Sequence, residues 1–244
     1  MNLRGNPLQV PNSGKNRATS HYSRFKVRML SDMYFQPLVS LRKRVIDSLP
    51  HPDLYVPEVD EISFINNHCG AAGESIGIFS GDDLIAYAML GLPEDEGEST
   101  FAHALDIGST PLNETAYLSS CMVLPGFRGH GLQRALISSR MTLARVLGRG
   151  RCMAIVSPHN HISRQNLLDS GLHLIGTRDV EGHMRQIMSS LPGTPPHDWR
   201  ELAEVDACDV ETQAGLVERG FLGFAQTMSN GNATLIFGRS AARE

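Results

Sequence analysis

Apolar positions along the chain predict a mixed α/β fold. Apolar residues recur at three- and four-residue steps from Ser31 to Leu49 and again from Gly131 to Leu147, as in amphipathic helices. The apolar runs at 115–124 and 152–157 are typical of strands. Residues 73–93 contain two apolar runs around a Ser-Gly-Asp-Asp turn. Since Gly and Asp tolerate tight turns, this segment predicts a hairpin.

Less regular signals complete the predicted order of elements. Pro50 and Pro52 end the first long helix, and Gly171, which lacks a Cβ, closes a helix at 162–170. The other expected elements are a strand at 25–30, a short helix at 58–67, strands at 172–177 and 183–188, a tail helix at 209–219, and tail strands near 221–228 and 233–238.

Composition divides the chain into three parts. Residues 1–22, rich in Asn, Ser, Gly, Pro and basic residues, predict a disordered or loosely docked arm. Residues 24–190 carry the α/β domain, and a Pro- and Gly-rich linker opens a C-terminal extension at 191–244. NLLDSGL (166–172) and GLVERGF (215–221) both run from helix through glycine to strand. Because that pattern is common, we favour coincidence over a half-repeat.

Charge and cysteine content exclude several classes of protein. The chain has 22 Lys and Arg against 26 Asp and Glu, a net charge of −4, which argues against a general nucleic-acid binder. Its 4 cysteines form no Cys-x-x-Cys pair and fit a reducing compartment. The first residues lack the apolar core of a signal peptide, and the longest apolar run, 84–92, is too short to span a membrane. We therefore expect a cytoplasmic protein without nucleic-acid or membrane partners.

The most informative segment is SSCMVLPGFRGHGLQRAL at 119–136, which predicts a strand, a glycine-punctuated loop and a helix. Gly129 and Gly131 let the backbone turn tightly and approach a ligand without a Cβ collision. The free amides of such a loop and the dipole of the following helix favour an anion, typically a phosphate. On these residues alone, a plain turn is the alternative.

The spacing of this loop resembles the acyl-CoA loop of the GNAT superfamily of N-acyltransferases. Arg128, Gly131 and Gln133 occupy the fixed positions of the pattern Gln/Arg-x-x-Gly-x-Gly/Ala. Gln133 departs from the usual small residue, and its long side chain fits only if it points away from the pyrophosphate.

A second block, SPHNHISRQNLLDSGL at 157–172, resembles another part of the family. Asn160, Ser163 and Gly171 match its strand, Asn-x-x-Ala/Ser, helix and glycine. The order of elements agrees as well, so the resemblance covers about 24–190. It implies a splayed mixed sheet flanked by helices, here followed by a C-terminal helix–hairpin extension.

The resemblance implies an acyl-CoA-dependent N-acetyltransferase. Acetyl-CoA is the implied cosubstrate and no metal is needed. The acetyl group would pass by direct attack to an amine of unknown identity, on a small molecule or a peptide. The alternative is a non-catalytic acyl-CoA sensor. The implied cofactor-binding residues are Met122, Val123, Pro125, Arg128, Gly129, His130, Gly131, Leu132, Gln133, Arg134, Asn160 and Ser163.

The catalytic acid and base are less evident. Leu167 stands where many relatives place a Tyr near the departing sulfur, and Tyr117 stands where some place a Glu. Ser119 and Glu114 are the other candidates for a catalytic role. Strand alternation predicts one shared, pocket-lining face for Tyr117, Ser119, Cys121 and Val123.

Other chemistry-bearing residues have simpler interpretations. Cys121 fits a small buried thiol better than a nucleophile, and His159 and His161 lack a third metal ligand at suitable spacing. The arginines that follow the loop are expected mostly on a solvated helix face: Arg140, Arg145, Arg149 and Arg151. The acidic run at 93–98 is expected to be an exposed loop. The tail is expected to cap the acceptor cleft, to recruit a partner or to form a homodimer.

Overall fold

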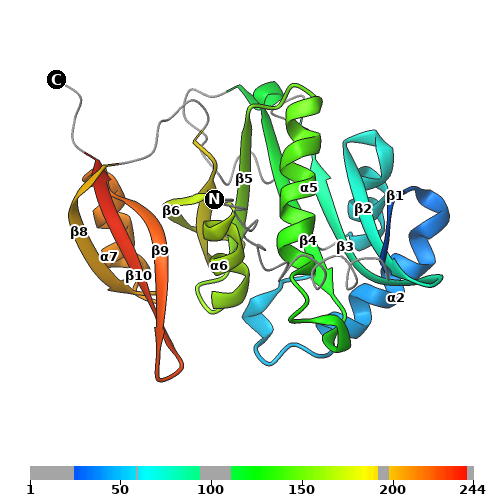
Figure 1. Cartoon of the computed structure of the whole chain (residues 1–244), viewed down its shortest axis with the longest axis horizontal. Helices are drawn as coiled ribbons and strands as arrows, with labels where there is room; N and C mark the ends of the chain where they lie inside the picture. The colour runs from blue at the N-terminus through cyan, green and yellow to red at the C-terminus, as the bar shows by residue number, and fades with distance from the viewer. Residues whose placement is uncertain (1–24, 59, 94–110, 192–197, 241–244) are drawn as a thin grey trace, which may run out of the picture.

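A computed structural model describes residues 25–58, 60–93, 111–191 and 198–240 and arranges their strands in a single ten-stranded sheet (Figure 1). The order across the sheet is β1-β2-β3-β4-β5-β7-β6-β9-β10-β8. All neighbouring strands run antiparallel except β4 and β5. The strands are β1 (Phe25–Leu30), β2 (Gly73–Ser80), β3 (Asp83–Gly91), β4 (Thr115–Val123), β5 (Arg151–Val156), β6 (His173–Val180), β7 (His183–Ser189), β8 (Trp199–Asp206), β9 (Leu222–Ser229) and β10 (Asn232–Ser240).

Helices flank this sheet, which confirms the predicted mixed α/β class. They are α2 (Phe35–Ile46), α3 (Glu61–Asn66), α5 (Leu132–Val146), α6 (His161–Asp169) and α7 (Val210–Glu218). The predicted order of elements is correct from β1 to β7, although α2 ends before the expected Leu49 and α3 is shorter than 58–67. The predicted arm and the acidic run beyond Pro93 lie outside the described residues.

Strand β8 was not predicted. Its sequence, WRELAEVD, follows a Pro- and Gly-rich stretch and carries four charged residues. An edge strand needs apolar side chains only where it faces the core, and β8 lies at the edge of the sheet. The mixture of charged and apolar residues in β8 is also typical of a solvated linker, which is why the sequence did not predict a strand here.

Strands β4 and β5 separate soon after they pair. Their parallel register covers only Thr115–Tyr117 against Arg151–Met153. On its other flank, β4 has one extra residue between the pairs Ala88–Cys121 and Leu90–Leu118. This bulge re-aims the following side chains and bends the strand. The resulting gap between β4 and β5 is the central feature of the fold.

The bulge also corrects an expectation. Tyr117, Ser119, Cys121 and Val123 do not share one face, because the extra residue resets the alternation after Ser119. The hydroxyls of Ser119 and Ser120 reach His68 and Arg42, which precede β2 in the chain. Cys121 is half-buried beside Arg140 of α5, whose charge lowers the pKa that burial of the thiol raises.

The C-terminal unit repeats the unit before it. β5-α6-β6-β7 is followed by β8-α7-β9-β10, and the two helices begin 49 residues apart, as do the two strands that follow each helix. The capping is the same: Asn160 and Asp209 each accept a hydrogen bond from the amide three residues on, at 3.1 Å. Gly171 and Gly220 end the helices with φ of 85° and 82°. Coincidence, the interpretation favoured from sequence, is therefore wrong.

The two units are related by an approximate two-fold axis. The strand order β5-β7-β6-β9-β10-β8 reads the same from either end of the repeat. At its centre, Leu174 pairs with Gly223, which is the equivalent residue 49 positions later. Helix α6 packs against β9 and α7 against β6. One hydrophobic core includes Leu167, Leu174, Leu216, Leu235 and Phe237, so both units share it.

Gly223→Val tests this junction. A Cβ at Gly223 would lie 2.9 Å from the Cβ of Leu174, with strands packed on both sides. We expect the free energy of unfolding to fall by about 1–3 kcal/mol, the usual cost of overpacking a core. Urea unfolding followed by the fluorescence of Trp199, the chain's one tryptophan, measures it.

Gly215→Ala is the matched control for Gly223→Val. A Cβ at Gly215 in α7 has no neighbour within 4 Å, so this change should add about 0.5–1 kcal/mol. Equal unfolding midpoints for Gly223→Val and the unmodified protein would contradict the close packing at the axis.

Candidate active site

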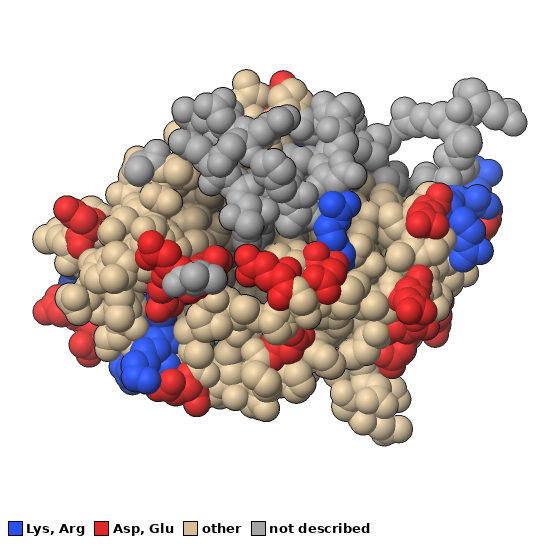
Figure 2. Space-filling view, turned by 180° about the vertical axis from the view of Figure 1, so that it is seen from behind, with Lys and Arg blue, Asp and Glu red and all other residues tan. Residues whose placement is uncertain are grey.

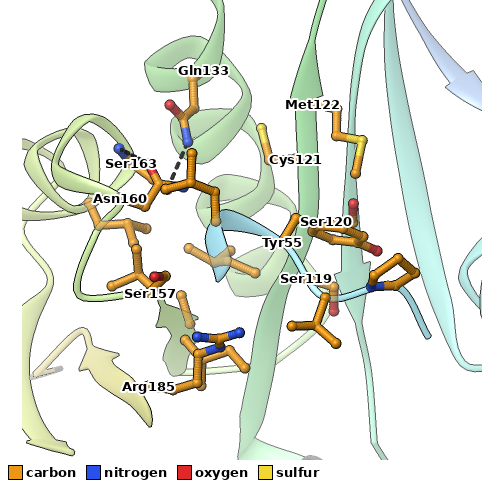
Figure 3. A pocket seen from close by; sticks show the side chains of 18 of the residues that line it. Tyr55, Ser119, Ser120, Cys121, Met122, Gln133, Ser157, Asn160, Ser163 and Arg185 are labelled. Carbon is orange, nitrogen blue, oxygen red and sulfur yellow. Dashed lines mark hydrogen bonds between the residues drawn. The ribbon is translucent and has the colours of Figure 1, made fainter. Parts of the chain in front are cut away.

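The gap between β4 and β5 opens into a cavity of about 250 Å³ (Figure 3). Residues from β4, β5, α5, α6 and the connection between α2 and α3 line it, together with residues at the turn between β6 and β7. None of the lining residues belongs to 198–240, so the described part of the tail does not cap the cleft. Two chemically different ends can be distinguished.

One end lies near the glycine loop, since Gln133 in the first turn of α5 lines the cavity. Gly129 and Gly131 have φ of 80° and 72°, a conformation that L side chains rarely adopt. The first backbone hydrogen bond of α5 runs from the amide of Ala135 to the carbonyl of Gly131, at 3.1 Å. The amides of 132–134 precede it and have no intrahelical acceptor. These donors and the helix dipole fit the pyrophosphate of a coenzyme A molecule.

The side chain of Gln133 points to α6 (Figure 3). Its amide donates to the hydroxyl of Ser163 at 3.0 Å and accepts from Asn166 at 2.7 Å. The long side chain therefore joins α5 to α6, which explains how it is accommodated where the family has a small residue.

The structure brings together only part of the predicted site. Five of the predicted residues line the cavity: Ser119, Met122, Gln133, Asn160 and Ser163. The others of the cofactor set form the end of β4, the loop and the first turn of α5: Val123, Pro125, Arg128, Gly129, His130, Gly131, Leu132 and Arg134.

Two catalytic candidates lie away from the cavity. Tyr117 packs with Met153 and Ile187, and burial raises its pKa to about 12. Glu114 is exposed at the start of β4 and does not line the cavity. Of the three candidates, Ser119 is the one that the structure places in the cleft.

Two arginines correct another expectation. Arg140 is 2% exposed, and its Nη1 donates to the carbonyls of Met89 and Ser119 at 2.9 and 3.1 Å. Arg149 is also buried and donates to the carbonyls of Pro93 and Leu112. Both side chains hold backbone in place and do not lie on a solvated helix face. Arg140 fixes the bulged part of β4.

A buried arginine missed by the sequence analysis orders the cavity wall. Arg42 of α2 is 0% exposed and donates to the hydroxyls of Tyr55, Tyr87 and Ser120 at 2.5, 2.6 and 3.1 Å. It also forms a salt bridge with Glu61 at 2.6 Å. A signal was present: position 42 falls on the helical stripe of the apolar residues Leu38, Leu41 and Val45.

His68, also missed, lies behind Ser119. It belongs to a wide helical turn, Asn67–Ala71, that is kinked at Gly70. Its Nδ1 lies 2.8 Å from the carbonyl of Phe64 and its Nε2 lies 3.1 Å from the hydroxyl of Ser119. Burial lowers the pKa of His68, the hydrogen bond to the Phe64 carbonyl raises it, and the charge of Arg42 lowers it; the net shift is downward.

The other end of the cavity is acidic. Glu58 and Glu181 both line it. Burial raises the pKa of Glu58, the negative charge of Glu181 raises it further, and the charge of Arg42 acts in the opposite direction. Arg185 is also there, but Asp53 holds its guanidinium at 3.0 Å. Figure 2 shows the general excess of acidic over basic side chains on one face of the molecule.

Neither a metal site nor a membrane span was found in the described residues. No group of three or more His, Cys, Asp or Glu residues there could hold a metal ion. No described helix is both long and apolar enough to cross a membrane.

Comparisons with known proteins identify the family. Residues 40–167 match the model of the acetyltransferase (GNAT) family. A GNAT acetyltransferase from Streptococcus pneumoniae superposes with a TM-score of 0.53 at 13% identity, covering 69% of this chain and 99% of its own. A putative acetyltransferase from Salmonella typhimurium, solved with its cofactor acetyl-CoA, gives 0.52 at 14% identity, covering 72% and 98%. No curated protein sequence matches the chain significantly.

The chain therefore belongs to the GNAT acetyltransferase family. Its fold is that of the solved acetyltransferases. The superpositions include almost all of those two proteins but only about 70% of this chain. Part of this chain therefore has no counterpart in them.

Gly131→Glu tests the anion site. A carboxylate at the start of α5 would oppose a phosphate, so we expect the affinity for CoA to fall at least 100-fold in calorimetric titration. Gly148→Glu is the matched control, since Gly148 follows the other end of α5 with φ of 79° and imposes the same backbone strain. Equal CoA affinity in the two variants would exclude the loop as the phosphate site.

Proposed function

We propose that the protein transfers an acetyl group from acetyl-CoA to a primary amine, which attacks the thioester directly. The observation that carries this proposal is the geometry of the cleft. The anion cradle lies beside the cavity at Gln133, acidic residues line another part of it, and the opened edge of β4 runs along it. In this arrangement an amine and a thioester carbonyl can meet at β4.

The β4 edge supplies the electrostatic stabilisation. Where β4 leaves β5, its backbone no longer pairs on that side. We assign an amide at Met122 or Val123 to the oxygen on which negative charge develops. Such a preoriented donor contributes several kcal/mol to catalysis. Acetyl-CoA supplies the activated acyl group.

The acidic end favours a cationic acceptor. Among the described residues no salt bridge joins Glu58 or Glu181 to an arginine or lysine, although the charge of Arg42 acts on Glu58. Arg185 is neutralised by Asp53. A carboxylate pair at the mouth of a cleft attracts a positively charged group. We infer an acceptor with a second cationic group beyond its reacting amine, on a small molecule or a peptide.

A non-catalytic acyl-CoA sensor is the second candidate. Leu167, which is 4% exposed and lines the cavity, favours it, because a leucine cannot protonate a departing thiolate. The two functions differ in whether the thioester is consumed.

Thermal unfolding and thiol release test the two candidates. A ligand at 100 times its dissociation constant adds about 2.7 kcal/mol, so acetyl-CoA and CoA should each raise the midpoint by about 5–10 °C. ATP is the control and should not. Release of CoA thiol with an amine would establish transfer, stabilisation without release from any amine would support the sensor, and no stabilisation would exclude both.

Glu181→Asn tests the inferred acceptor class. With 1,5-diaminopentane as acceptor we expect KM to rise about fivefold, the effect of losing roughly 1 kcal/mol of charge attraction in water. With pentylamine, which lacks the second charge, KM should stay within twofold. A comparable rise for both amines would contradict a role in charge recognition.

The second unit provides the control for Glu181→Asn. Glu181-Gly182 forms the turn of one hairpin and Asn230-Gly231 that of its repeat, with φ of 54° and 51° at the first position. Asn-Gly is the favoured pair for such a turn. Asn230→Glu should therefore lower the unfolding midpoint without changing either KM, whereas Glu181→Asn should raise the midpoint.

A further inference from the structure

Ser119 in the cleft wall and His68 behind it form a hydrogen-bonded pair. Ser119 lies at the bulge of β4 and lines the cavity, whereas His68 does not line it. The Nε2 atom of His68 is 3.1 Å from the Ser119 hydroxyl. Any proton that reaches His68 from the cavity along this pair has to pass through Ser119.

The surroundings fix which nitrogen of His68 carries the proton. Nδ1 is 2.8 Å from the carbonyl oxygen of Phe64, which can only accept a hydrogen bond. Nδ1 is therefore the donor in the neutral ring, and Nε2 presents its lone pair to Ser119. The serine hydroxyl then donates to Nε2, which is the arrangement of a hydroxyl activated by a base.

The packing holds the imidazole in this position. Cβ atoms at Gly73 and Gly91 would lie 3.2 and 3.4 Å from His68 ring atoms, so both strands leave room for the ring. The Phe64 ring covers it, with centroids 4.5 Å apart. Arg42 supplies the charge that acts on His68, while uncharged residues face it from α3, β2, β3 and β4: Phe64, Gly73, Gly91 and Ser119.

We propose that His68, acting through Ser119, is the base that prepares the acceptor amine. This proposal rests on the proposed function. The substrate ammonium passes one proton to Ser119 Oγ as the serine proton moves to His68 Nε2. The freed nitrogen lone pair forms the N–C bond to the acetyl carbon, and the C–S electron pair leaves with sulfur. The second amine proton ends on that sulfur as CoA thiol, and His68 returns its proton to solvent.

The charge state of His68 suits this task. Burial and the positive charge of Arg42 lower its pKa and outweigh the hydrogen bond to the Phe64 carbonyl, which raises it, so the pKa lies below the usual 6.5. The imidazole is therefore neutral, and able to accept a proton, at neutral pH and somewhat below. Protonation at lower pH removes the base, so the acid limb of the kcat/KM profile should lie below pH 6.5.

Kinetics test the relay. The acceptors for this test are 1,5-diaminopentane and a peptide that begins with alanine. His68→Gln should lower kcat about 100-fold and leave KM within twofold. It should also remove the acid limb of the kcat/KM profile. Ser119→Ala should cause a similar loss, and the double variant no further loss. His51→Gln, an exposed histidine outside the cavity lining, is the matched control. An active enzyme whose kcat and acid limb survive His68→Gln would overturn the relay alone.

A nuclear magnetic resonance titration tests the same pair without turnover. The ring nitrogen shifts of His68 should show the Nδ1–H tautomer in the CoA-bound protein, and Ser119→Ala should move the Nε2 resonance. The Nε2–H tautomer would overturn the proposal, because His68 would then donate to Ser119. If the unmodified protein binds acetyl-CoA but acetylates neither acceptor, the proposed function fails on these substrates and the relay falls with it, whatever the tautomer.

Discussion

The separation of β4 from β5 is the constraint on which the rest of the structure depends. Two parallel strands that part leave backbone donors and acceptors facing a gap, and such groups must find other partners. On the other flank of β4, at the bulge against β3, Arg140 donates to the carbonyl of Ser119 at 3.1 Å and to that of Met89 at 2.9 Å. A buried guanidinium is costly unless its donors are used. Arg140 is therefore tolerated in the interior because the bulge leaves carbonyl groups for it to bind.

The same principle applies to Arg42 and to part of Arg164, which are both 0% exposed. Nη2 of Arg164 is the exception, since it is buried and has no hydrogen-bond partner among the described residues. Arg42 binds the serine hydroxyl that the bulge turns toward it. Arg164 joins the carbonyl of Pro158, before α6, to Gln186 and to Gln226 of the second unit. The planar guanidinium with its five donors suits such irregular sets of acceptors. The interruption that opens the cleft is thus fixed by polar side chains.

Comparison of the two repeated units separates the residues that the fold requires from those that line the cleft. It keeps the helix cap, the closing glycine and the hairpin turn of the first unit. It differs where the first unit lines the cleft or the junction: Asp209 stands for Asn160, and Gln213 for Arg164. A carboxylate at the cap would oppose an anion, so the start of α7 is less suited to a phosphate than the start of α6. Its strand β9 instead covers the edge of β6. The hydrogen bond between Gln186 and Gln213, at 2.8 Å, is buried where the units meet.

Local chemistry could be read from the sequence, whereas long-range placement could not. Gly129 and Gly131 need a left-handed backbone within a few residues, so the loop and its helix were predictable. The pair of His68 and Ser119 spans 51 positions and depends on the kink at Gly70 and the bulge in β4, neither of which has a periodic signature.

At the hairpin turn of Glu181, the local sequence preference and the position in the fold lead to different conclusions. Positive φ at a two-residue turn is a local property, and Asn230 satisfies it in the second unit. Glu satisfies it poorly, so the sequence alone makes Glu181 look like an unfavourable choice. The structure supplies the reason that the sequence lacks, because Glu181 lines the cleft and its charge acts on Glu58. Where two copies of a turn differ at the residue facing a cavity, the poorer turn former is the better candidate for function.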